Sequence, residues 1–184
     1  LRSEYSTAVN QWNLAPRIAF AYRISKNWTS SLAYGRFYQN PENQYFGTHD
    51  LNFQKAEHYV LQVQKADEGR SFRAEAFYKN YEDLIKTKLE KYRPVAISNN
   101  GDGFAKGIEL FWRDKKSIKN IDYWVSYSFL DSKRNFQNYD QSLFPNFAAK
   151  HTLSLVVKKF VTDWKTGFNL SYSYASGRPY YNFL

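Results

Sequence analysis

The chain has 184 residues and a formal net charge of +9, and it contains neither cysteine nor methionine. The lack of cysteine excludes disulfides, thiolate metal sites and a thiol nucleophile. The mean hydropathy of −0.68 and the lack of a long apolar run exclude a transmembrane helix and the core of a signal peptide.

The N-terminal part predicts one hairpin. Residues 1–13 carry little pattern, and the first predicted strand is Leu14–Ile24, in which apolar residues alternate with small or charged ones. Pro16 lies near its start, where a missing backbone N–H is tolerated. A short turn leads to a second strand, Trp28–Gln39, and a long polar connection, Asn40–Phe53, follows.

The segment Gln54–Ile85 predicts two long strands joined by a turn at Ala66–Gly69. Its residues alternate with a period of two, which favours strand over helix. The turn contains Asp-Glu-Gly, and glycine supplies the positive φ that a tight turn needs. A second long connection, Lys86–Asp102, is expected to follow.

The same unit recurs twice toward the C-terminus. Strands Gly103–Arg113 and Ile121–Leu130 flank a basic turn, and a third long polar connection, Asp131–Phe147, follows them. Strands Lys150–Phe160 and Trp164–Ala175 form the last hairpin. The chain therefore predicts eight strands in four hairpins, with short turns at one end and long connections at the other.

Strand length and patterning predict an all-β fold made of antiparallel transmembrane β-barrel strands. Strands of about ten residues match the span of a tilted membrane strand and exceed the length usual in soluble sheets. Aromatic residues make up 20% of the chain and can form girdles at the two membrane–water interfaces. The opposite face is small, polar and charged, as in a wet or plugged lumen. The charged residues predicted to line the lumen are Arg17, Arg23, Arg73, Glu75, Lys79 and Glu109.

Much of the positive charge lies at two predicted turns, Arg113–Lys119 and Lys158–Lys165. A solvated rim that keeps the turns in water is the first explanation. Attraction of anionic lipid headgroups is the alternative.

Several segments resemble the barrel strands of TonB-dependent outer-membrane receptors. Members of that family have a barrel of about 22 strands filled by an N-terminal plug domain. The resemblance implies that residues 1–184 are a partial barrel domain from the C-terminal side, without the plug and the last strands. The lack of methionine fits a fragment or a processed product. The segments are LAPRIAFAYRISKNWTSSLAYGRFYQNP (14–41), FRAEAFYKNYEDLI (72–85), NNGDGFAKGIELFWR (99–113), KHTLSLVVKKF (150–160) and GFNLSYSYASGRPYYNF (167–183).

The resemblance also implies a function. Such receptors lie in the outer membrane of Gram-negative bacteria and take up a scarce ligand such as an iron–siderophore, cobalamin or another metal chelate. The expected partners are outer-membrane lipid, the plug and remaining barrel strands, and an inner-membrane energy-coupling protein that acts through the absent N-terminal part. The charged residues predicted in the lumen would pair with the plug or with each other, or would contact ligand.

Other chemistry finds little support in the sequence. His49, His58 and His151 lack metal-ligand spacing, so no metal site and no cofactor are expected. His151 and Ser154 resemble a hydrolase pair without a third residue, so no enzyme is expected. The mixing of aromatic and basic residues follows the strand alternation, so no nucleic-acid site is expected.

Three alternatives remain open. A complete eight-stranded outer-membrane protein with a structural or adhesive role would close by itself. An outer-membrane enzyme acting on lipid would depend on His151 and Ser154. A soluble sandwich could bind carbohydrate through its aromatic residues.

Overall fold

The computed structural model describes residues 1–45, 51–90 and 93–181, without the side chains of residues 89, 90, 93 and 94. Its main element is an antiparallel sheet of eight strands, in which strands adjacent in the chain are neighbours. A separate two-stranded sheet precedes it. The main sheet consists of β3 (Arg17–Arg23), β4 (Trp28–Gln39), β5 (Gln54–Asp67), β6 (Arg70–Glu90), β7 (Arg93–Asp114), β8 (Ile121–Asn135), β9 (His151–Val161) and β10 (Thr166–Ala175), and the small sheet of β1 (Arg2–Ser6) and β2 (Gln11–Ala15).

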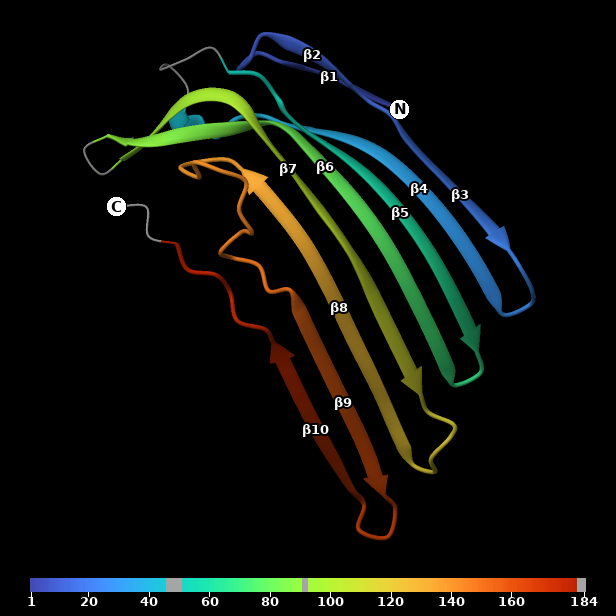
Figure 1. Cartoon of the computed structure of the whole chain (residues 1–184). Helices are drawn as coiled ribbons and strands as arrows, with labels where there is room; N and C mark the ends of the chain where they lie inside the picture. Colours follow the sequence, from blue (N-terminus) through green and yellow to red (C-terminus); the bar gives the residue numbers. More distant parts are fainter. Residues whose placement is uncertain (46–50, 91–92, 182–184) are drawn as a thin grey trace.

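The strands of the main sheet lie side by side in one tilted, curved layer (Figure 1). The four hairpin turns lie at one end, which we call the lower end, and the longer connections and both described termini lie at the upper end (Figure 1). β3 and β10 are the edges of the sheet, which does not close on itself within the described residues. This arrangement confirms the predicted eight antiparallel strands in four hairpins. Helical structure in the described part is limited to the 3₁₀ turn η1 (Asn43–Tyr45), and no helix there is long and apolar enough to cross a membrane.

The N-terminal residues form a small hairpin where the sequence predicted none. β1 pairs with β2, and the ring centroid of Tyr5 lies 5.2 Å from that of Trp12. The predicted strand Leu14–Ile24 is wrong at its start, because the chain passes from β2 to β3 at Pro16. Proline has no N–H to donate to a continuous ladder, so the pairing changes partner there.

The predicted connection Lys86–Asp102 is also wrong, because β6 and β7 continue through it as one long hairpin. Their register shifts between Tyr81 and Leu84, and Asp83 has a positive φ of 58°. A β-bulge of this kind adds an unpaired residue and changes which side chains share a face. The alternation that marks the lower part of the strands is therefore lost above the bulge, although the backbone pairing continues.

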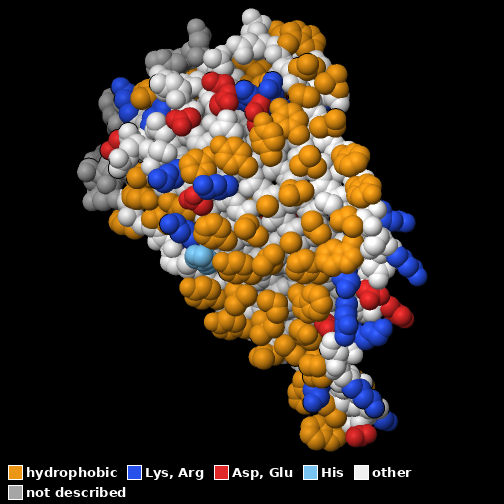
Figure 2. All heavy atoms as spheres, turned by 45° about the vertical axis from the view of Figure 1, so that its right-hand side comes forward, with side chains coloured by type: hydrophobic (Ala, Val, Ile, Leu, Met, Phe, Trp, Pro, Cys, Tyr) orange, Lys and Arg blue, Asp and Glu red, His pale blue; other side chains and the backbone are white. Residues whose placement is uncertain are grey.

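The two faces of the main sheet differ in chemistry. One face carries large apolar side chains that are strongly exposed, such as Ile18 at 70% and Leu170 at 64%. Figure 2 shows a broad field of hydrophobic side chains, with charged side chains gathered beyond it. We call this the apolar face and its opposite the polar face. Exposed members of the apolar face are Ile18, Phe20, Tyr22, Leu32, Leu61, Ile108, Phe168, Leu170 and Tyr172.

Aromatic rings form a row near each end of the apolar face. Successive ring centroids are 6.2 and 6.4 Å apart in the lower row and 5.1 and 6.4 Å apart in the upper row. Such rings favour a membrane–water interface, where one end of the side chain is apolar and the other reaches water. The lower row is Trp28, Phe72 and Trp112, and the upper row is Tyr34, Tyr59 and Tyr78.

The cluster of buried apolar residues lies at the upper end and consists of Tyr45, Leu51, Ile85 and Ala96. It holds the upper connections against the long β6–β7 hairpin.

Between the two aromatic rows, the apolar face of the sheet is exposed. Such a face is suited to a hydrocarbon environment, because its side chains are apolar and its backbone groups are paired between strands.

A buried carboxylate organises the turn between β7 and β8. The Asp114 side chain is 2% exposed and accepts hydrogen bonds from the backbone N–H groups of Lys116 (2.7 Å) and Ser117 (2.9 Å). The Ser117 hydroxyl also donates to it (2.6 Å), and the Arg70 guanidinium lies 3.2 Å away. These hydrogen bonds, led by those from Ser117, lower the pKa of Asp114 from 3.8 to about 2.

We expect Leu61→Arg to destabilise the protein in lipid by about 2–4 kcal/mol, because this side chain lies near the middle of the apolar face. Gln62→Arg is the matched control, since it places the same charge one residue away on the polar face. Urea unfolding in lipid vesicles, followed by tryptophan fluorescence, measures both. Equal losses of stability would contradict the assignment of the two faces.

The pH dependence of stability tests the Asp114 turn. Because the pKa of Asp114 is lower in the folded state, its contribution is present above about pH 4 and is lost as the pH falls toward about 2. We expect Asp114→Asn to be less stable than the parent at neutral pH, and the difference to shrink between these two values. Asp163→Asn, in the neighbouring β9–β10 turn, is the control and should match the parent. A deficit of Asp114→Asn that stays constant down to about pH 2 would refute this role.

Candidate functional site

The six charged residues predicted from the sequence all lie on the polar face. Alternation along each strand places them opposite to the exposed apolar residues. The register brings Glu75 of β6 directly opposite Glu109 of β7. Whether this face lines a lumen remains a prediction. The six residues are Arg17 and Arg23 on β3, Arg73, Glu75 and Lys79 on β6, and Glu109 on β7.

Three of the cations contact aromatic rings instead of carboxylates. The guanidinium of Arg17 lies 4.5 Å from the ring centroid of Phe37, and that of Arg73 lies 6.0 Å from the ring of Phe111. The ammonium of Lys79 lies 5.0 Å from the Phe77 ring. Within the described residues, none of the six charges takes part in an ion pair with another of the six. The polar face therefore presents charges that its own side chains do not neutralise.

Two glycines let aromatic side chains lie flat on the polar face. Phe77 is directly opposite Gly107, and a Cβ added to Gly107 would lie 2.8 Å from its ring and 2.2 Å from the backbone oxygen of Phe129. The ring of Phe37 covers Gly35 in the same way, at 2.8 Å from a Cβ there. A side chain at either glycine would therefore meet an aromatic ring.

A cavity of about 540 Å³ opens at the upper end of the polar face. It lies where the upper parts of β4, β5, β6 and β8 meet the 3₁₀ turn η1. Burial, together with the carboxylate of Glu42, raises the pKa of the Tyr45 hydroxyl in its wall. The lining residues are Phe37, Tyr38, Gln39, Glu42, Tyr45, Gln54, Lys55, Ala56, His58, Tyr81, Leu84, Ile85, Arg134, Phe136 and Gln137.

Arg134, which lines this cavity, is surrounded by aromatic rings and lacks a partner for one of its N–H groups within the described part of the chain. Its guanidinium carbon lies 4.3 Å from the ring centroid of Tyr81, 5.7 Å from that of Phe136 and 5.6 Å from that of Phe147. Its Nε is buried and has no hydrogen-bond partner among the described residues. The ring contacts hold the group in place, and the Nε–H donor has no acceptor among the described residues.

Arg134 was not among the predicted site residues, because the sequence pattern indicated a connection at Asp131–Phe147. In the structure β8 continues to Asn135, and Arg134 lies opposite Gly103 of β7. The missing side chain at Gly103 leaves room for it, since a Cβ there would lie 2.9 Å from Cγ of Arg134. The signal available in the sequence was the continued alternation of β8 through Ser132 and Arg134.

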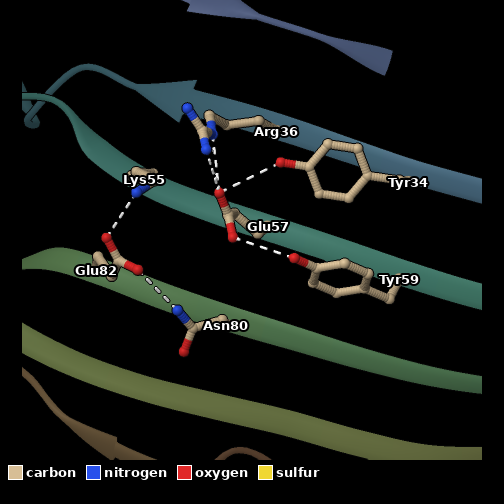
Figure 3. A network of polar contacts seen from close by, with 7 residues as sticks. All are labelled: Tyr34, Arg36, Lys55, Glu57, Tyr59, Asn80 and Glu82. Carbon is tan, nitrogen blue, oxygen red and sulfur yellow. Dashed lines mark hydrogen bonds and ion pairs between the residues drawn. The ribbon is translucent and has the colours of Figure 1, made fainter. Parts of the chain in front are cut away.

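Charges at the upper edge of the apolar face are arranged differently, because they are paired (Figure 3). Glu57 accepts hydrogen bonds from Arg36 (2.8 Å), Tyr34 (3.3 Å) and Tyr59 (3.4 Å). Beside it, Lys55 lies 2.7 Å from Glu82. Tyrosine hydroxyls of the upper aromatic row thus end on a neutral ion-pair network, which suits a boundary between hydrocarbon and water.

The histidines do not form a catalytic or metal site in the described part of the chain. His151 and Ser154 lie on opposite faces of β9, and Nδ1 of His151 is 2.9 Å from the Tyr127 hydroxyl on the apolar face. His58 lies on the polar face near the ring of Phe37, 4.5 Å between centroids. His49 lies outside the described residues. Among the described residues, no three His, Cys, Asp or Glu side chains gather as metal ligands would.

Comparison with known proteins agrees with this geometry. A family model described as TonB dependent receptor-like, beta-barrel, matches residues 1–184. The chain is similar in structure to the alcaligin outer membrane receptor FauA from Bordetella pertussis, with 16% identity and a TM-score of 0.67 over 91% of this chain and 30% of that chain. It is also similar to the FrpB iron transporter from Neisseria meningitidis, F3-3 variant, with 14% identity and a TM-score of 0.69 over 88% of this chain and 26% of that chain.

A third similar structure is the ferric-catecholate import receptor Fiu from E. coli K12, with 15% identity and a TM-score of 0.60 over 83% of this chain and 22% of that chain. At these identities the likeness concerns the fold. The chain spans 22–30% of the length of these three receptors. No curated protein sequence matches it.

The close contact at Gly107 gives a test of the polar face. We expect Gly107→Ala to destabilise the protein by about 1–3 kcal/mol, because the added methyl group would meet the backbone of β8 as well as the Phe77 ring. Gly167→Ala is the control, since its Cβ would lie 3.8 Å from the nearest side chain. Unfolding in lipid vesicles measures both variants. A Gly107→Ala protein as stable as Gly167→Ala would show that Phe77 does not pack on this backbone.

Proposed function

The chain belongs to the TonB dependent receptor-like β-barrel family, and we propose that it forms part of the barrel of an outer-membrane receptor that takes up a scarce iron chelate. The match to the family model over residues 1–184 supports the receptor class, which is one of transport proteins and not of enzymes. The apolar face between two aromatic rows supports a place in the outer membrane of a Gram-negative bacterium, in contact with its lipid.

Within this proposal, residues 1–184 are a partial barrel domain. The edge strands β3 and β10 would pair with further strands of the same barrel, and the plug would lie outside these residues. The chain spans less than a third of the three similar receptors, which supports this division. A complete eight-stranded protein would require β3 to pair with β10, and these two strands are the separate edges of the sheet.

The polar face would then line the lumen, with Arg17, Arg73, Lys79 and the Glu75–Glu109 pair directed toward its contents. Charges there avoid the cost of facing lipid. Energy would come from the inner membrane through a coupling protein that acts on the plug. The barrel segment would bind and guide the ligand without a cofactor of its own.

Arg134 is the observation that carries the ligand assignment. A guanidinium held by aromatic rings, with a buried N–H that has no partner, is suited to a planar, negatively charged acceptor. Iron chelates present ionised oxygen atoms to the guanidinium, and catecholate chelates also present flat rings. The solved structures of similar fold include receptors for alcaligin and for ferric catecholates.

Uptake by the complete receptor in its own outer membrane tests this assignment. We expect Arg134→Gln to raise the half-saturation concentration for a radio-iron chelate about tenfold or more, because hydrogen bonds to charged groups contribute roughly 1.5–3 kcal/mol. Catecholate and hydroxamate chelates are supplied one at a time. Arg134→Lys keeps the positive charge but lacks the planar fork of N–H donors. Its half-saturation concentration should lie between those of the parent and of Arg134→Gln.

Arg113→Gln is the control, because it also removes a guanidinium but lies at the lower end, where Arg113 is bound to Asp122. Surface amounts of each variant are compared by immunoblotting after mild heating. Uptake by Arg134→Gln that equals the parent for every chelate would contradict the ligand role. Uptake that fails equally in Arg113→Gln would point to a folding defect instead.

A further inference from the structure

Six lysines gather at the lower end of the sheet, on the β7–β8 turn and around the β9–β10 turn. Residues 113–122 and 158–166 together hold seven basic and three acidic residues, a net charge of +4. The two segments are adjacent, because the backbone N–H of Phe160 donates to the carbonyl of Asn120 (3.1 Å). We call this cluster the basic rim, and its members are Lys115, Lys116, Lys119, Lys158, Lys159 and Lys165.

The nearby carboxylates are already occupied. Asp114 is bound by the N–H groups and hydroxyl of its own turn and by Arg70. Asp122 accepts two hydrogen bonds from Arg113, at 3.0 and 2.7 Å, and Lys115 reaches it only at 3.9 Å. No other lysine of the rim has an ion pair within the described part of the chain.

This excess of positive charge is local to the lower end, as a comparison with the upper edge of the apolar face shows. There Arg36 lies 2.6 Å from Glu57, and Lys55 lies 2.7 Å from Glu82. Lys106 lies 3.5 Å from Asp131 in the same way. At the lower end Arg70 and Arg113 are paired with carboxylates, but five of the six lysines of the rim have no ion pair within the described part of the chain.

The basic rim is continuous with the apolar face. On β9, Lys159 stands on that face, with Ile121 of β8 on one side and Phe168 of β10 on the other. Trp164, in the β9–β10 turn, is 71% exposed, and its ring centroid lies 6.4 Å from that of Phe168. Lys165 follows Trp164 directly. The lysines of the rim therefore lie next to aromatic rings, and these rings lie next to the apolar surface of β9 and β10.

We propose that the basic rim binds an anionic phospholipid of the leaflet that faces the short turns. Lys159 and Lys165 contact its headgroup phosphate, and Trp164 and Phe168 contact the glycerol and upper acyl chains. Short turns of outer-membrane barrels face the periplasm, so this is the inner leaflet. A free anion would need only the charge, whereas an amphipathic lipid also accounts for the rings and the apolar surface beside it.

This inference rests on the membrane placement in the proposed function, and it is independent of the ligand that is taken up. The complete receptor is reconstituted in nanodiscs of phosphatidylethanolamine with or without phosphatidylglycerol, and bound lipid is counted by native mass spectrometry. We expect phosphatidylglycerol to be enriched on the parent receptor. Lys159→Gln/Lys165→Gln should weaken its binding about twenty-five-fold, because each lysine at an anionic surface contributes roughly fivefold.

Lys26→Gln/Lys133→Gln is the matched control, since it removes the same charge at sites away from the rim. Lys159→Arg/Lys165→Arg keeps the charge and should retain the lipid, which separates lost binding from misfolding. Equal losses in the glutamine pair and the control pair would overturn the proposal, as would a parent receptor that does not enrich phosphatidylglycerol. Inorganic phosphate that displaces the lipid fully at millimolar concentration would show a free-anion site instead. Failure to insert into any nanodisc would count against the membrane placement itself.

Discussion

Backbone hydrogen bonding is the constraint on which the rest of this molecule depends. Hydrocarbon offers no water to N–H and C=O groups, so a chain that crosses it as strands must pair every strand with a neighbour. The ladder meets this requirement for β4 to β9 by joining neighbours in chain order, with a turn of few residues at each lower end, and it leaves one side of β3 and of β10 unpaired. Pairing of this kind turns alternate side chains to opposite faces, and this separates the apolar face from the polar face.

The charged side chains are arranged differently at the two ends of the sheet. At the upper edge of the apolar face Arg36, Lys55 and Lys106 each have a carboxylate within reach, and tyrosine hydroxyls complete the network around Glu57 (Figure 3). Neutral pairs reduce the cost of holding charge near hydrocarbon. At the lower end the carboxylates shape turns instead, as Asp114 does, and the lysines beside them stay uncompensated. The two ends of one sheet thus present different surfaces to the two sides of a membrane.

The sequence was sufficient for the hairpins and the faces wherever the alternation was unbroken. The faces of β5 and β6 were predicted from the period of two, and the pairing of Gln62 with Glu75 is consistent with them. The prediction failed where a local event reset that period, at Pro16 and at the bulge near Asp83. Arg134 was missed for a related reason, since its role depends on rings that come from β6 and from the connection after β8. Contacts between such distant segments are fixed by the sheet and are not visible in any local pattern.

The charges that this chain leaves unpaired lie where other molecules or segments would meet it. Glu75 and Glu109 face each other across neighbouring strands, an arrangement that weakens a sheet unless a cation lies between them or above them. Among the described residues, Nε of Arg134 has no hydrogen-bond partner in the upper cavity, and five of the six lysines of the basic rim have no ion pair. A sheet selected only for its own stability would pair these groups, as it does around Glu57. On the proposed function, the three sites correspond to the filled lumen, the arriving ligand and the inner leaflet. The sheet therefore carries a local electrostatic cost that its surroundings in the receptor would offset.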